Sequence, residues 1–158
     1  MAIDSTANSP ALAGKQRALL DNLTRLPDPQ ERLGWLVEQA RRRPLMEAAL
    51  RTDEHRVEGC LARLWLVTEF RDGHCHYRCE SDSLVVKAIA GLLCEFYSGH
   101  APGEILAHDP AFLAELGVTQ HLTPNRRNGL ALVWGKIRAF AQNQLPPFSA
   151  PEIPAARA

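Results

Sequence analysis

Apolar residues recur every three to four positions in the first third of the chain, which predicts helices. Residues 11–25 form one such helix, with leucines on its apolar face. A second helix is expected to begin after Asp28, because aspartate caps helix N-termini and Pro29 suits the first helical position. It runs to about Arg43, and the segment PLMEAALR (44–51) is expected to form a short further helix.

The middle of the chain has a β-rich pattern. Residues 53–59 are polar and irregular, which predicts a loop, and residues around Val57 are expected to add a short strand. LARLWLVTEF (61–70) predicts a strand, RDG (71–73) is typical of a hairpin turn, and HCHYRCES (74–81) predicts the returning strand.

Helical spacing returns at Ser83 and predicts a buried helix that ends at residues 98–99. Two short helices are expected at about 102–107 and 110–116, and a last helix is capped by Thr123. Helices, then a small antiparallel sheet, then helices predict an α+β domain.

The expected organisation has three parts. Residues 1–10 form a flexible N-terminus, residues 11–144 form one domain, and residues 145–158 form a disordered tail rich in proline and alanine. A chain of 158 residues is long enough for one domain with a core.

Charge and composition exclude some classes of function. The chain has 18 basic and 18 acidic residues, which argues against a general nucleic-acid binder. It shows neither a signal-peptide pattern nor an apolar run of membrane-spanning length, so a cytoplasmic location without membrane association is expected. In that reducing environment the four cysteines are expected to be free thiols or ligands rather than disulfides.

The stretch HCHYRCE contains four residues of types that bind metals. On a strand, however, His74 and His76 point to one face while Cys75 and Cys79 point to the other, so no tetrahedral set converges. We therefore expect no metal site here, with the thiols facing inward. Cys94 lies in an apolar helix and is expected to belong to the core.

Two stretches stand out for chemistry. Cys60 follows Gly59 at a loop-to-strand junction, where the thiol is either a packed hydrophobe or a presented reactive group. Arg126 and Arg127 lie in the first turn of a helix, where the dipole disfavours cations. They indicate either an anion or acidic partner, or an ordinary exposed turn.

Four stretches together resemble the SufE family of sulfur acceptors in iron–sulfur cluster assembly: VEGCLARLWL, ESDSLVVKAIAGLL, FYSGHAPGEIL and LGVTQHLTPNRRNGL, in family order and spacing. The resemblance extends from about residue 15 to residue 142. It implies a SufE/IscU-like fold, a small curved antiparallel sheet packed with helices. It also implies an activity: a persulfide sulfur is taken from a cysteine desulfurase, which is stimulated, and is passed to an iron–sulfur scaffold complex.

The resemblance also assigns residues. Cys60 stands at the family's cysteine position, Arg126 at its arginine, and Ser81 and Asp82 at its Ser-Asp pair. Where the family commonly has Gly-Cys-Gln-Ser-Gln, this chain has Gly-Cys-Leu-Ala-Arg, so the exchanges after the cysteine fall at positions 61–63. Asn125 and Arg127 replace serines beside the arginine.

From these features we expect Cys60 to carry the sulfur, with Gly59, Asp82, Arg126 and Arg127 binding the partner or stabilising the thiolate. Docking is favoured for the two arginines because they make a two-charge patch. A shielding pocket for the thiol is expected from Leu61, Leu64 and Trp65.

Cofactor and partners follow from the same resemblance. No cofactor is expected on this chain, whereas the desulfurase carries pyridoxal phosphate. Whether the chain forms a weak homodimer is left open by the sequence. The alternatives to the sulfur acceptor of cluster assembly are an adaptor for another acceptor, such as a tRNA-modifying route, and a metal- or cluster-binding scaffold.

Overall fold

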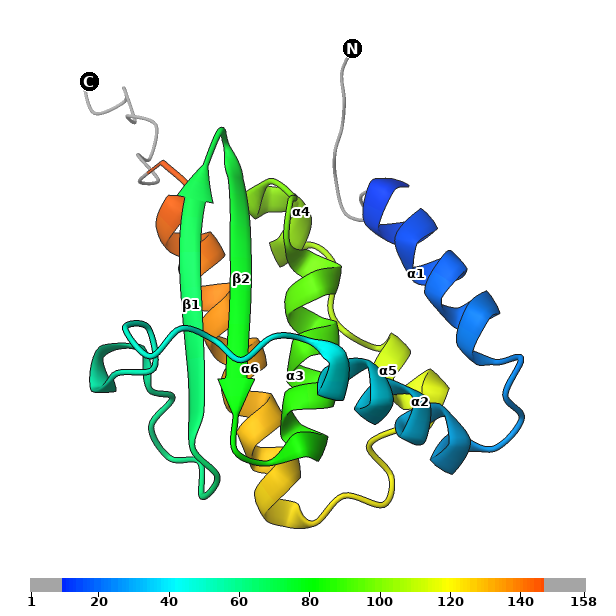
Figure 1. The fold of residues 1–158 in the computed structure, drawn as a ribbon. Coiled ribbons are helices and arrows are strands. Elements are labelled where there is room, and N and C mark those ends of the chain that lie inside the picture. Colours follow the sequence, from blue (N-terminus) through cyan, green and yellow to red (C-terminus); the bar gives the residue numbers. More distant parts are fainter. Residues whose placement is uncertain (1–9, 147–158) are drawn as a thin grey trace, which may run out of the picture.

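The computed structural model describes residues 10–146, in which a two-stranded hairpin is backed by helices (Figure 1). The elements in chain order are α1 (Pro10–Leu23), α2 (Pro29–Arg42), the 3-10 turn η1 (Asp53–His55), β1 (Leu64–Arg71), β2 (His74–Ser81), α3 (Leu84–Tyr97), α4 (Pro102–Leu106), α5 (Phe112–Leu116) and α6 (Pro124–Gln144). The predicted α+β class is confirmed.

The predicted hairpin turn is confirmed in detail. β1 and β2 pair antiparallel up to Arg71 and His74. Between them, Asp72 (φ 55°) and Gly73 (φ 80°) both adopt the left-handed conformation. Two consecutive residues with positive φ are typical of the type I′ turn, whose twist matches that of the strands.

The centre of the molecule is α3, in which ten of 14 residues are buried. It packs against β2, α2 and α6, and α3 and α6 lie side by side behind the hairpin (Figure 1). The Tyr77 hydroxyl donates a hydrogen bond of 3.0 Å to the Ile137 carbonyl and so joins β2 to α6. No helix among the described residues is long and apolar enough to cross a membrane.

Side-chain caps fix where the helices begin. Asp28 accepts a hydrogen bond from the Gln30 amide at the start of α2, and Thr123 accepts one from the Arg126 amide at the start of α6. Both predicted caps are confirmed. Ser83 caps α3 in the same way. Each cap satisfies an amide that the helix itself leaves without a partner.

Two expected elements do not form. The segment 44–51 is extended and then turns, so the prediction of a short helix is wrong. Its Met46 amide donates to the buried Glu80 carboxylate at 3.0 Å, which holds the segment across β2 instead. The expected third strand is reduced to one bridge between Arg56 and Trp65, where the Val57 amide donates to the Leu64 carbonyl.

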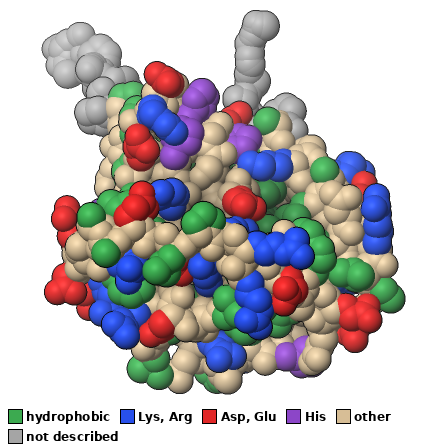
Figure 2. Space-filling view, in the orientation of Figure 1, with side chains coloured by type: hydrophobic (Ala, Val, Ile, Leu, Met, Phe, Trp, Pro, Cys, Tyr) green, Lys and Arg blue, Asp and Glu red, His purple; other side chains and the backbone are tan. Residues whose placement is uncertain are grey.

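The strand expected from residue 61 begins at Leu64, and residues 60–63 form a loop. The segments expected to be flexible (1–10) or disordered (145–158) lie outside the described residues, apart from their innermost positions. Figure 2 shows side chains of both charge signs spread over the face in view, as the balanced composition suggests.

Candidate functional site

Cys60 lies half-buried on the loop between η1 and β1, against α6. Gly59 before it has φ 89°, a conformation that favours glycine. The Gly59 carbonyl accepts a hydrogen bond of 3.2 Å from the Asn128 side chain. The sulfur lies over Gly129, where an added Cβ would come within 2.8 Å of Sγ. The two glycines, one on the loop and one on α6, therefore let the thiol sit against the helix backbone.

A cavity of about 290 Å³ opens beside this thiol. It lies between the Cys60 loop and the first turns of α3 and α6, and it is lined by Cys60, Leu61, Ala62, Ser83, Val86, Thr123, Asn125 and Arg126. Neither helix has an acidic residue in its first turn. Because helix N-termini carry partial positive charge, the cavity favours an anionic group.

The loop is fixed at its far end by the junction of β2 and α3. The Arg63 amide donates to the Asp82 carboxylate at 3.0 Å, and the Asp82 amide donates to the Arg63 carbonyl at 3.2 Å. The Ser81 hydroxyl donates to the same carbonyl at 2.7 Å. The loop of residues 60–63 is therefore fixed at both ends, by a hydrogen bond to α6 on one side and by hydrogen bonds to the end of β2 on the other.

The structure brings together only some of the predicted site residues. Arg126 and Arg127 are both exposed, but only Arg126 lines the cavity of Cys60. Asp82 lies outside the cavity and anchors the loop. The roles of these residues toward a partner stay predictions.

The expected shielding pocket is partly wrong. Leu64 and Trp65 are buried and do not line the cavity, because β1 carries them into the molecule. Leu61 does line it, but the residue is 78% exposed. Val86 and Gly129 were missed by the sequence analysis, since both belong to helices distant from Cys60 in the chain.

The other cysteines have different environments. Cys75 and Cys94 are buried, as expected, whereas Cys79 is half-buried. Burial raises the pKa of Cys75, and a hydrogen bond to Cys79 together with burial raises the pKa of Cys94. In both thiols the thiolate form, which is the better nucleophile, is therefore disfavoured. Within residues 10–146, no group of three or more His, Cys, Asp or Glu could hold a metal ion.

Gly129 offers a test of the packing around the sulfur. We expect Gly129→Ala to push the Cys60 thiol away from α6, so that the rate of its alkylation by iodoacetamide changes at least about threefold. Gly135 on the same helix has no atom within 4 Å of an added Cβ, so Gly135→Ala is the matched control. That control should stabilise the fold by about 0.5–1 kcal/mol and leave alkylation unchanged. Equal alkylation rates for both variants would contradict the packing of Cys60 on Gly129.

Comparison with known proteins gives three findings. The family model described as "SufE: Fe-S metabolism associated domain" matches residues 17–141. Two curated relatives are an uncharacterized SufE-like protein of Rhizobium meliloti, 28% identical over 81% of this chain and 95% of that protein, and one of Synechocystis, 30% identical over 78% of this chain and 77% of that protein. The solution structure of a hypothetical protein from Thermus thermophilus is similar, with a TM-score of 0.65 and 25% identity over 82% of this chain and 94% of that chain.

Proposed function

Because the chain belongs to the SufE family, whose domain is associated with Fe-S metabolism, we propose that it is a sulfur-transfer protein that accepts a persulfide sulfur on Cys60. The donor is the persulfide of a cysteine desulfurase, which this protein stimulates. The sulfur then passes to an iron–sulfur scaffold complex. We place this exchange in the cytoplasm.

The observation that carries the proposal is the position of Cys60 in a cavity between two helix N-termini. In the transfer, the Cys60 thiolate attacks the outer sulfur of the donor persulfide. A new S–S bond forms on Cys60, the old one breaks, and the donor leaves as a thiolate. The step has no net oxidation and needs no cofactor on this chain. The positive helix ends, with Arg126, stabilise the persulfide anion that results.

The surroundings of the thiol also fit delivery by another protein. Leu61, the next residue, is 78% exposed. An apolar side chain this exposed beside a reactive group is a suitable contact for a partner surface. The half-buried thiol and its cavity, in turn, shield the persulfide between transfers.

The direct test is to incubate the protein with a cysteine desulfurase and cysteine and to measure its intact mass. One sulfur should add about 32 Da, and cyanolysis should remove it. Protein that gains no cyanolysable sulfur but is purified with stoichiometric zinc or iron would instead support the metal- or cluster-binding scaffold. The same assay with different acceptors identifies where the sulfur goes.

Arg126 should affect the local charge at the cavity rather than the stability of the fold. We expect Arg126→Ala to leave the unfolding midpoint unchanged, because a cation in the first helical turn is slightly unfavourable. Iodoacetate is anionic and iodoacetamide is neutral, so their relative rates at Cys60 report local charge. Arg126→Ala should lower the iodoacetate-to-iodoacetamide ratio about threefold to tenfold, which corresponds to roughly 1 kcal/mol.

Arg127→Ala is the matched control, since Arg127 lies on the same turn outside the cavity. It should leave the ratio unchanged. If it raises the desulfurase concentration needed for half-maximal stimulation, the docking prediction for this residue is supported. An unchanged ratio in Arg126→Ala removes Arg126 from the chemistry of the cavity.

A further inference from the structure

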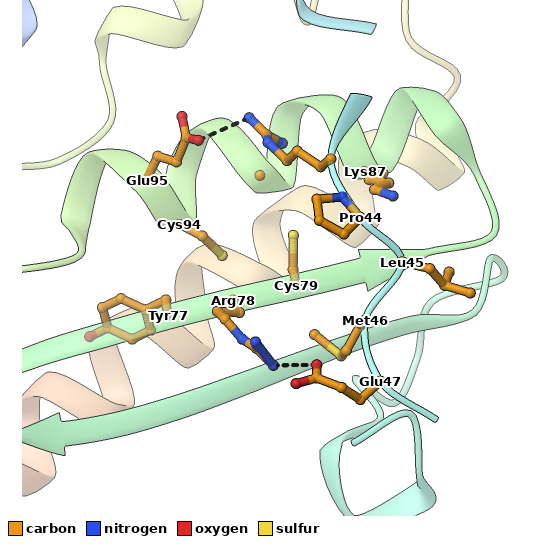
Figure 3. Close-up of a pocket in the computed structure, with 12 residues that line it drawn as sticks. Pro44, Leu45, Met46, Glu47, Tyr77, Arg78, Cys79, Lys87, Cys94 and Glu95 are labelled. Carbon is orange, nitrogen blue, oxygen red and sulfur yellow. Dashed lines mark hydrogen bonds and ion pairs between the residues drawn. The ribbon is translucent and has the colours of Figure 1, made fainter. Parts of the chain in front are cut away.

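A second cavity, of about 520 Å³, lies between β2, α3 and the segment that follows α2 (Figure 3). It shares no lining residue with the cavity of Cys60. Cys79 from β2 and Cys94 from α3 both line it. In Figure 3 their side chains point toward each other across the space between the strand and the helix. The proposed sulfur transfer uses neither of them.

The two thiols are close but unequal. A hydrogen bond to Cys79 raises the pKa of Cys94, and burial adds to the effect. Cys94 is only 3% exposed, whereas Cys79 is half-buried at the cavity wall. A small oxidant that enters the cavity therefore meets the more exposed Cys79 first, with Cys94 next to it on the facing helix.

The rest of the cavity wall carries charges of both signs. Arg43 lies directly over Gly91, which leaves it room because glycine has no side chain. Its charge lowers the pKa of Cys94, against the larger effects of Cys79 and burial. Lys87 also lines the cavity. Both cations are ion-paired, Arg43 with Glu95 at 3.3 Å and Lys87 with Glu80 at 3.1 Å. It is therefore the closeness of the two sulfurs, and not a net positive charge, that suits the pair to disulfide formation.

We propose that Cys79 and Cys94 are an oxidation-sensitive pair that hydrogen peroxide converts into a disulfide between β2 and α3. The Cys79 thiolate attacks one peroxide oxygen, the O–O bond breaks, and hydroxide leaves to be protonated to water. The Cys94 thiol then attacks the sulfur of the Cys79 sulfenic acid, the S–O bond breaks, and the departing hydroxide takes the Cys94 proton and leaves as a second water as the S–S bond forms. Two electrons pass from the two sulfurs to the peroxide, and thiol reductants reverse the change.

The disulfide cross-links the elements on which the Cys60 loop is anchored. The bond joins β2 to α3, the two elements whose junction anchors the Cys60 loop through Ser81 and Asp82. It also prevents Cys79 from advancing to the irreversible sulfinic acid. The proposal does not depend on sulfur transfer by Cys60.

The test uses the full chain carrying Cys60→Ser, which removes the other half-buried thiol. The protein is treated with a small excess of hydrogen peroxide, quenched, denatured, alkylated with N-ethylmaleimide and weighed by mass spectrometry. We expect two fewer alkylated cysteines and, before alkylation, a loss of about 2 Da for the two hydrogens. Peptide mapping should find Cys79 joined to Cys94, and dithiothreitol should restore both thiols.

Two further variants in the same background make the result specific. Cys75→Ala removes a buried cysteine of the same strand and should leave the disulfide yield unchanged. Cys94→Ala, with its folding checked by circular dichroism, should stop the reaction at a Cys79 sulfenic acid that dimedone traps. The proposal is overturned if peroxide leaves all three thiols free, joins a different pair, or drives Cys79 to sulfinic acid in the presence of Cys94. The mapping of the Cys60→Ser protein decides this even if Cys94→Ala does not fold.

Discussion

Cys60→Ser should reduce both sulfur loading and desulfurase stimulation to the level seen without the carrier, while the protein stays folded. Serine replaces the sulfur with an oxygen, which fits the same half-buried place on the loop. A neutral hydroxyl does not attack sulfane sulfur at neutral pH, whereas a thiolate does. Intact-mass analysis should therefore find no gain of about 32 Da after incubation with a desulfurase and cysteine.

The other three cysteines provide matched controls. Cys75→Ser, Cys79→Ser and Cys94→Ser should each keep the adduct and the stimulation, with alanine in place of serine where burial of the hydroxyl destabilises the fold. Cys79→Ser is the most informative, because Cys79 is half-buried like Cys60 and also lines a cavity. A sulfur adduct that survives Cys60→Ser and disappears in Cys79→Ser would move the proposed acceptor to the second cavity.

Local signals in the sequence were enough to predict most of the helices and strands. The turn at Asp72 and Gly73 needs only two residues with positive φ, and the caps Asp28 and Thr123 act within three positions of themselves. The failure at residues 44–51 has a non-local cause. There the Met46 amide bonds to the Glu80 carboxylate, 34 positions away, and this contact prevails over a weak helical preference.

The site was only partly predictable for the same reason. The family resemblance pointed to Cys60 and Arg126, and both line one cavity. The remaining walls depend on how α3 and α6 pack against the loop, which no periodicity reveals. The sequence predicted that Cys79 faces inward and that Cys94 is buried. It could not predict that the two thiols lie close together, because that depends on how β2 and α3 pack against each other.

Lys87→Met should destabilise the fold by about 3–5 kcal/mol, because it would leave a buried carboxylate without its counter-charge. The Lys87 ammonium lies 3.1 Å from Glu80, and the two side chains are 11% and 3% exposed. Glu80 also accepts hydrogen bonds of 3.0 Å from the Met46 and Ser81 amides. The ion pair thus joins α3 to the end of β2, next to the anchor of the Cys60 loop, and the Met46 amide joins the segment after α2 to the same carboxylate. Urea unfolding of the variant and the wild type measures the loss.

The companion variants separate the ion pair from the loss of a long side chain. Lys136→Met on the exposed surface of α6 should change stability by less than about 0.5 kcal/mol. The double variant Glu80→Gln with Lys87→Met should recover part of the loss, because a neutral pair has no uncompensated charge to bury. A cost below about 1 kcal/mol for Lys87→Met alone would mean that the two backbone amides suffice to hold the Glu80 carboxylate. In that case the end of β2, and with it the Cys60 loop, is fixed by hydrogen bonds rather than by charge.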